Sequence, residues 1–178
     1  MQKSFRVLVA LVVVAAGIWA WRTFFPKPER VIRSRLIKLA ELNSFEPGEG
    51  NIAKAYAMQK LDGYFTPDVT VNLDFRGYEP VSFDGRQELV SSVNRMRFYL
   101  RGLKVELPDI NVTLGPDKHT ASADVTGKFT ISGEHDFTVQ ELKFTFKKVN
   151  GKWLIDHVET VKTLGRIQTT APALAMAQ

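Results

Sequence analysis

The apolar residues of the chain change their spacing near residue 100. Before that point they recur every three or four positions, as on the buried side of amphipathic helices, and after it they alternate with polar residues, as in half-buried strands. The first spacing predicts three helices, at residues 28–43, residues 51–61 and from Asp84 to about Leu100. The expected N-caps are Asn51 for the second helix and, for the third, Asp84 with Gln87 as a capping box.

The alternating part predicts four antiparallel strands, at residues 103–114, 120–131, 137–148 and 153–161. The pair Asn150-Gly151 between the last two is the strongest hairpin signal in the chain. In the third strand the apolar positions change parity between Val139 and Leu142, so we expect a β-bulge near Gln140–Glu141. A further half-buried strand, at residues 69–73, comes before the third helix.

These elements predict an α+β fold of one domain. Three helices packed on one face of a curved antiparallel sheet would enclose a cone-shaped cavity. The domain is expected to span residues 27–164, followed by a flexible tail over residues 165–178. A length of 178 residues fits one globular domain with short appendages.

An uncharged apolar run at residues 7–21, bounded by arginines, precedes this domain. At about 1.5 Å per residue it spans about 22 Å of a hydrocarbon layer that is about 30 Å thick. Two interpretations remain: a cleaved signal peptide, or a signal anchor extended by the aromatic residues that come after it. Trp19 and Trp21 flank the bond that a signal peptidase would cut, which favours an uncleaved transmembrane helix as the anchor within residues 1–26.

The charges around this run give opposing predictions of its orientation. Cations are more numerous after it than before it, which by the positive-inside rule favours a cytoplasmic domain. A short basic tail ahead of an apolar run is the usual signal for export of the domain behind the run, and the absence of cysteine does not oppose export. We therefore expect a single-pass protein of the cell inner membrane whose domain is periplasmic or otherwise extracytoplasmic.

Composition excludes several classes of site. The sequence contains no cysteine, so it has no disulfide, thiolate metal site or cysteine nucleophile. Its three histidines lack metal-ligand spacing and no phosphate-binding glycine motif is present, so we expect no metal and no cofactor. The net charge is +5, but residues 1–26 contribute three cations and no acid, which leaves the domain near neutral and gives no indication of a nucleic-acid partner.

Three segments of the domain together resemble a known superfamily. They are Gly63–Val71 (GYFTPDVTV), Phe83–Val90 (FDGRQELV) and Asn150–Ile155 (NGKWLI). Their order and spacing resemble the nuclear transport factor 2-like superfamily, which includes SnoaL-like cyclases and ketosteroid isomerases. The resemblance covers about residues 28–161 and implies a cone-shaped α+β domain, often dimeric, with a pocket between helices and sheet. It implies no single function, because the fold carries enzymes, binding modules and assembly components.

The residues for isomerase chemistry are missing from the positions that this resemblance implies. The general base of ketosteroid isomerases corresponds to Leu73, and the carboxylate of Asp74 would face the opposite side of the strand. The tyrosine that donates to the oxyanion corresponds to a position near Lys38. Whether the chain is an enzyme stays open, with the sequence favouring no catalytic role.

Four side chains are candidates for binding a ligand in the cone: Tyr56, Tyr64, Glu141 and His157. The tyrosines could place hydroxyls in the pocket or pack in the core. Glu141 and His157, on late neighbouring strands, could point inward or belong to an outward polar face. The basic residues near the end of the third helix are expected to be solvated: Arg95, Arg97, Arg101 and Lys104.

The sequence thus favours a membrane-anchored, non-catalytic binding or assembly domain. Its plan is similar to that of inner-membrane components of type IV secretion systems and of membrane proteins associated with lipid import. The expected partners are the membrane, components of a membrane-protein complex and a second copy of the chain in a homodimer. The alternative is a binder of a small apolar ligand, or a SnoaL-like or isomerase-type enzyme, that uses the cone pocket.

Overall fold

The computed structural model describes residues 12, 14, 27–74, 79–134 and 136–168. Apart from Val12 and Val14, the predicted anchor of residues 1–26 lies outside this part of the chain, as do residues 169–178 of the predicted tail. Among the described residues, no helix is both long and apolar enough to cross a bilayer.

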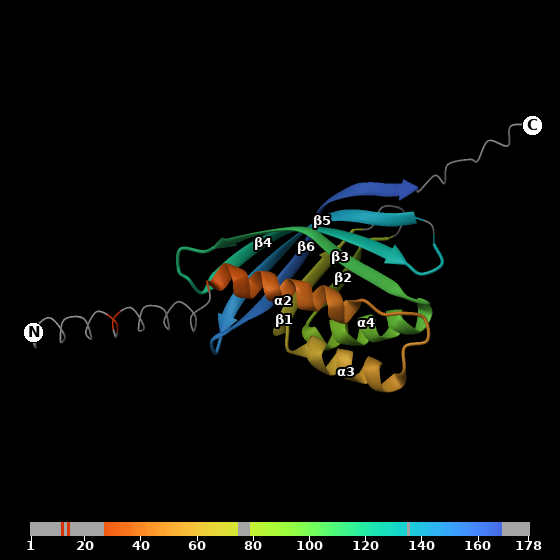
Figure 1. The fold of residues 1–178 in the computed structure, drawn as a ribbon, viewed down its shortest axis with the longest axis horizontal. Helices are drawn as coiled ribbons and strands as arrows, with labels where there is room; N and C mark the ends of the chain where they lie inside the picture. The colour runs from red at the N-terminus through yellow and green to blue at the C-terminus, as the bar shows by residue number, and fades with distance from the viewer. Residues whose placement is uncertain (1–11, 13, 15–26, 75–78, 135, 169–178) are drawn as a thin grey trace, which may run out of the picture.

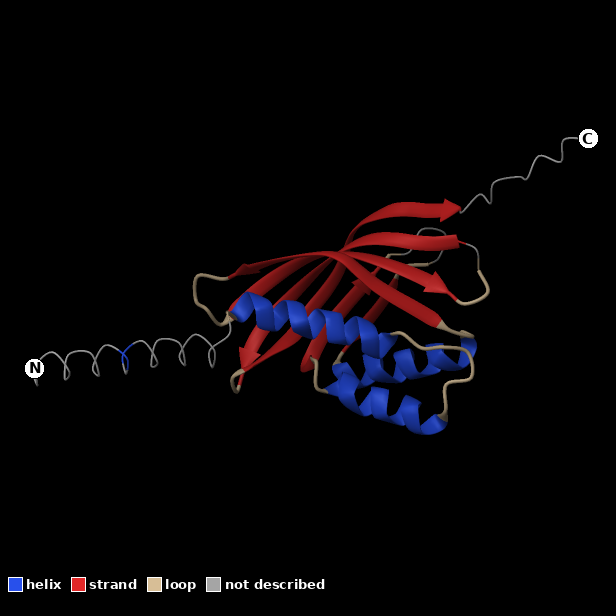
Figure 2. Cartoon of the chain, in the orientation of Figure 1, coloured by secondary structure: helices blue, strands red, loops and turns tan. Residues whose placement is uncertain are grey.

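Three helices gather on one face of a six-stranded sheet (Figure 1, Figure 2). The helices are α2 (Pro28–Asn43), α3 (Asn51–Asp62) and α4 (Arg86–Tyr99). The strands are β1 (Phe65–Leu73), β2 (Val81–Asp84), β3 (Leu103–Leu114), β4 (Thr120–Ile131), β5 (Asp136–Val149) and β6 (Lys152–Gln168). β6 extends into the segment predicted as a tail and pairs with β5 as far as Gln168, so residues 165–168 belong to the sheet.

The strands form one curved, mixed sheet in the order β2-β1-β6-β5-β4-β3. β3 to β6 are successive antiparallel neighbours, as predicted, but β1 pairs with β6 in parallel, from Phe65 beside Ile155 to Asn72 beside Glu159. The prediction of an antiparallel sheet is wrong at this place, because alternation reports the buried face of a strand and not the direction of its neighbour. β2 was not predicted, because its four residues, VSFD, are too short an alternating segment to identify a strand; it pairs antiparallel with β1.

The concave face of the sheet holds the core. Two cross-strand rows of apolar side chains run over it: Val112, Ala123, Phe144, Val158 and Val71, and Leu114, Ala121, Phe146 and Ile155. The alanines of β4 lie beside the phenylalanines of β5, so large and small side chains fill one layer. Ile32 and Leu36 of α2 are fully buried in the same cluster. The helices therefore close the concave side by apolar packing.

The β-bulge predicted near Gln140–Glu141 of β5 is wrong, because the irregularity at this point belongs to β6. The register shifts between Val139 and Gln140 and again between Glu141 and Leu142. The additional residues lie in β6, because β5 pairs with β4 without interruption along this stretch. β5 therefore keeps one parity, and Gln140 is fully buried in line with Leu142. Its Nε2 donates to the carbonyl of Asp74 at 2.8 Å, so a polar residue occupies a core position.

The helix starts differ from the predicted caps. α3 begins at Asn51 itself, with Gly50 before it, and α4 begins at Arg86, with Gly85 as its N-cap. Gly85 has φ 94°, a left-handed conformation that glycine adopts at no steric cost. This turn moves the start of α4 beyond Asp84, so the predicted capping box does not form.

A buried arginine fastens the loop between α2 and α3 to the end of α4. Arg97 is 2% exposed, and its Nη1 donates to both carboxylate oxygens of Glu49, at 3.0 and 2.8 Å. Its Nη2 donates to the carbonyl of Leu42, and its guanidinium lies 4.8 Å from the centre of the Phe45 ring. The expectation that Arg97 belongs to a solvated helix end is wrong, because this part of α4 packs against the loop.

We predict that Arg97→Met lowers the free energy of unfolding by about 3–5 kcal/mol, because it leaves the Glu49 carboxylate of the α2–α3 loop without its cation. Glu49→Gln should cost less, about 1–2 kcal/mol, since an amide oxygen still accepts a hydrogen bond from Arg97. Urea denaturation followed by circular dichroism measures both values. An Arg97→Met chain as stable as the natural one would contradict the structural role of this pair.

Candidate functional site

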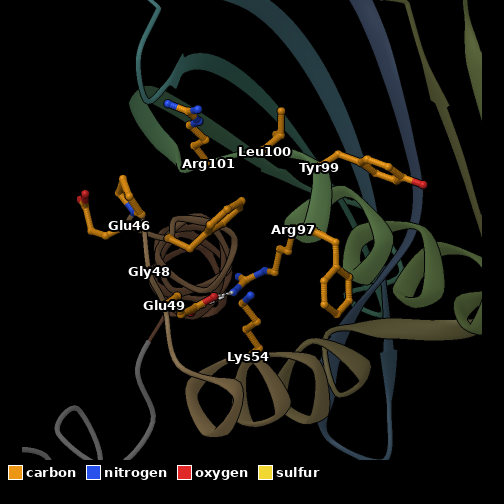
Figure 3. A pocket seen from close by; sticks show the side chains of 11 residues that line it. Glu46, Gly48, Glu49, Lys54, Arg97, Tyr99, Leu100 and Arg101 are labelled. Atoms are coloured by element: carbon orange, nitrogen blue, oxygen red, sulfur yellow. Dashed lines mark hydrogen bonds and ion pairs between the residues drawn. The ribbon is translucent and has the colours of Figure 1, made fainter.

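A pocket of about 250 Å³ lies at the end of the helical layer (Figure 3). Its walls are residues 45–49 of the α2–α3 loop, Lys54 of α3, and residues 97–101, where α4 ends and the chain turns toward β3. Three segments that are separate in the sequence thus meet around one hollow.

Hydrogen bonds and the buried ion pair hold the loop that forms one wall. Phe45 and Leu103 exchange backbone hydrogen bonds of 2.8 and 2.9 Å, which join the loop to the first residue of β3. The pair of Glu49 and Arg97 joins the other end of the loop to α4. Gly48, at φ 83°, makes the turn between these two points. The wall is therefore fixed at both ends and does not need a ligand to order it.

The lining of the pocket carries an excess of positive charge. Figure 3 shows Glu49 directed at Arg97, with Lys54 rising beside them from α3. Because Arg97 neutralises Glu49, the remaining charges of the lining are Lys54 and Arg101 against Glu46. Such a balance attracts carboxylates more than cations.

Exposed aromatic side chains lie beside these cations. Phe98 is 68% exposed and Tyr99 is 85% exposed, at the last two positions of α4. The Lys54 Nζ lies 5.1 Å from the centre of the Phe98 ring, within the range of a cation–π contact. Ile52, in the first turn of α3, is 89% exposed. Aromatic residues and arginine supply much of the binding energy of protein interfaces, so this end of the domain has the chemistry of a docking surface.

The two predicted tyrosines do not line this pocket. Tyr56 is 58% exposed on the outward side of α3, with the Lys60 Nζ 5.3 Å from its ring centre. Tyr64 comes after α3 and packs, half-buried, against the core, with the Arg35 guanidinium 4.6 Å from its ring centre. Burial lowers the pKa of Arg35 from its ordinary value. Tyr64 is thus a packing residue, and Tyr56 is a surface residue.

Glu141 and His157 lie on the face of the sheet that the helices do not cover. Each precedes a residue that points into the core, so its own side chain points away from the core. The His157 Nδ1 lies 2.6 Å from the Thr70 Oγ1, and its Nε2 lies 3.6 Å from a carboxylate oxygen of Glu159. The four predicted binding residues are therefore not brought together at one site.

The positions implied for isomerase chemistry carry no catalytic group. Leu73 packs against the core, Asp74 is exposed, and Lys38 is exposed on α2. Over the ranges that the structure describes, no three histidine, aspartate or glutamate side chains are grouped in a way that could hold a metal ion.

Sequence reasoning missed the pocket because its main support is a charged residue at a buried position. Leu89, Val93 and Arg97 are spaced four residues apart, which places Arg97 on the buried stripe of α4. This spacing could have predicted a buried Arg97. It was overlooked because Arg97 lies among other basic residues, Arg95 and Arg101, which together indicate an exposed helix end.

Comparisons with known proteins show the fold. No protein-family profile and no curated sequence matches the chain. A solved NTF2-like protein of unknown function from Pseudomonas putida is 12% identical, with a TM-score of 0.57 over 74% of this chain and 84% of its own. A putative scytalone dehydratase from Novosphingobium aromaticivorans is 15% identical, with a TM-score of 0.56 over 84% of this chain and 94% of its own.

A third similar structure is the yeast UBP3-associated protein BRE5, which is 14% identical, with a TM-score of 0.58 over 79% of this chain and 99% of its own. At these identities the likeness concerns the fold alone. Of the three names, one states no function, one an enzymatic activity and one an association with another protein. The chain has the NTF2-like, cystatin-like cone fold, with three helices on a curved mixed sheet.

Proposed function

We propose that the chain is a membrane-anchored, non-catalytic binding domain that docks an acidic segment of a partner protein. The docking site is the pocket between the α2–α3 loop and the end of α4. The observation that carries the proposal is the placement of two exposed aromatic side chains, Phe98 and Tyr99, beside a pocket lined by Lys54 and Arg101.

The two kinds of side chain have separate roles in this proposal. Phe98 and Tyr99 supply apolar contact area that water covers in the free domain. Lys54 and Arg101 select a carboxylate-bearing segment and speed its approach, because complementary charges contribute mainly to specificity and association rate. Arg97 keeps the wall in place and leaves its own charge satisfied by Glu49.

Three observations favour binding over catalysis. The strand position at which the family resemblance implies a general base holds Leu73, which packs against the core. One of the similar structures is described by its association with another protein, although the name of another supports the enzymatic alternative. A pocket at the outer end of the helices, rather than inside the cone, also suits a polypeptide partner better than an enclosed small molecule.

The anchor is the second part of the proposal. The uncharged run at residues 7–21 is the basis for it, with the domain placed on the extracytoplasmic side of the inner membrane. An anchor confines the domain near the bilayer, which raises its effective concentration for membrane-bound partners without any new contact.

We predict that the full chain sediments with membranes and resists extraction by alkaline carbonate, whereas a chain that starts at residue 27 does not. Protease added to spheroplasts should digest the domain of the full chain if it is extracytoplasmic. The intact mass of the purified protein separates the alternatives: loss of about 20 residues from the N-terminus would identify a cleaved signal peptide and overturn the anchor.

We predict that a photo-crosslinking residue at Tyr99 captures a discrete protein in membranes, whereas the same residue at Thr113, which is exposed on the outer side of β3, does not. The double variant Lys54→Glu with Arg101→Glu should reduce the crosslink about tenfold or more, because it reverses the charge of the pocket. With the captured partner in purified form, Phe98→Ala should weaken binding by about thirtyfold, the size expected for a central aromatic contact.

The matched control is Lys143→Glu with Lys152→Glu, which makes the same change of net charge at exposed positions away from the pocket. A crosslink that responds equally to both charge reversals would show a general effect of net charge. That result, or equal capture at Tyr99 and Thr113, would overturn the proposed docking site.

A further inference from the structure

We infer that the outer face of α2 and α3 rests on an anionic lipid surface, an inference that depends on the proposed membrane anchor. Only Pro26 and Lys27 separate α2 from the aromatic residues that extend the apolar run. A chain extends at most about 3.6 Å per residue, so Pro28 lies within about 11 Å of Phe25, the last of these aromatic residues. α2 therefore starts at the level of the lipid headgroups.

The charges and exposure of α2 suit such a surface. Arg33 and Arg35 donate to the backbone carbonyls of Ile110 and Gly63 inside the domain, which leaves Lys27, Arg30 and Lys38 as the basic side chains available to a surface, against Glu29 and Glu41. Arg30 and Lys38 are exposed, and Ile37, on the same outward side, is 44% exposed. Basic residues next to a membrane segment are attracted to anionic headgroups, and an apolar residue among them can enter the boundary below.

α3 presents a similar combination. Ile52 and Tyr56 are one helical turn apart and are 89% and 58% exposed, with Lys60 one turn further along the same side. The amphipathic ring of a tyrosine favours the boundary between water and hydrocarbon. Both helices lie on the same side of the sheet (Figure 1), and the proposal places one lipid surface against both of them.

The outer face of the sheet has a different pattern of charge. Asp124, Lys143 and Glu159 occupy neighbouring strands in one row, so charges of both signs alternate across it. Within the described part of the domain, Ile52 of α3 is the most exposed large apolar side chain, and Tyr99 and Phe98 of α4 belong to the proposed docking site. Val161 of β6 is 59% exposed, so apolar exposure alone does not select a face. The position of α2 directly after the apolar run, with exposed basic residues, selects the helical face.

The test uses the full chain in nanodiscs of phosphatidylcholine with about 30% phosphatidylglycerol. The sequence contains no cysteine, so single variants Ile37→Cys, Tyr56→Cys and Asp124→Cys can each carry one fluorescent label. All three positions are exposed, and a melting curve for each variant confirms that it folds. The measured quantity is the quenching of each label by lipids that carry a spin label in the headgroup region.

We expect quenching at Ile37→Cys and Tyr56→Cys to be at least about threefold stronger than at Asp124→Cys, because contact quenching needs the label at the lipid boundary. The difference should shrink in discs of phosphatidylcholine alone and at high salt, which screens exposed charges. Arg30→Glu with Lys38→Glu should shrink it in anionic discs. Equal quenching at the three positions, or the strongest quenching at Asp124→Cys, would overturn the inference.

This experiment separates the inference from the function on which it rests. A chain that does not elute with the discs has no anchor, and both proposals about the membrane then fail. A chain that elutes with the discs but shows no preference for the helical labels keeps the anchor, and only the orientation of the domain is then wrong.

Discussion

The need to cover the concave face of the sheet determines how the rest of the domain is arranged. Phe144 and Phe146 project from the middle of this face, and the alanines beside them on β4 leave room for side chains from above. Burial of apolar surface stabilises the folded state by about 25 cal/mol for each Å² removed from water. The concave face of the sheet therefore needs a covering layer. α2 supplies Ile32 and Leu36 to that layer, and its outer face is left for solvent or for another surface.

This packing also determines where polar and charged side chains lie on the surface. Apolar side chains occupy the concave face, and polar rows such as Thr70, His157 and Thr145 occupy the outer face of the sheet. Charged and exposed aromatic side chains gather at the end of the helical layer, where Arg97 joins the α2–α3 loop to α4. The buried Arg97 guanidinium holds the loop against the end of α4, and the two segments together form the wall of the pocket. Binding at an edge that three segments share is consistent with a domain that recognises another polypeptide.

The sequence predicted those parts of the fold that local periodicity encodes. Alternation located β3 to β6 to within a few residues except at the end of β6. The parity change after Val139 was misleading, because β5 contains no bulge and Val139 lies on the opposite face from Leu142. The parallel pairing of β1 with β6 depends on residues about 90 positions apart, which no local pattern reports. Arg97 is buried because Glu49 and the backbone carbonyl of Leu42 accept its hydrogen bonds. These partners are distant in the sequence, so the charge of Arg97 by itself predicted an exposed side chain. Tyr56 matched the pattern of a pocket residue, yet α3 turns it outward.

Hydroxyl-radical footprinting of the full chain tests most directly whether the helical layer is the functional face. The measurement compares oxidation rates of individual side chains in native membranes and in purified protein in detergent. Our account predicts that oxidation of Tyr56, Phe98 and Tyr99 slows several-fold in membranes, since lipid or a partner then covers them. His119, at the exposed turn between β3 and β4, should keep its rate. Protection of His119 and of the outer face of the sheet, with no change at the helical aromatic residues, would contradict it.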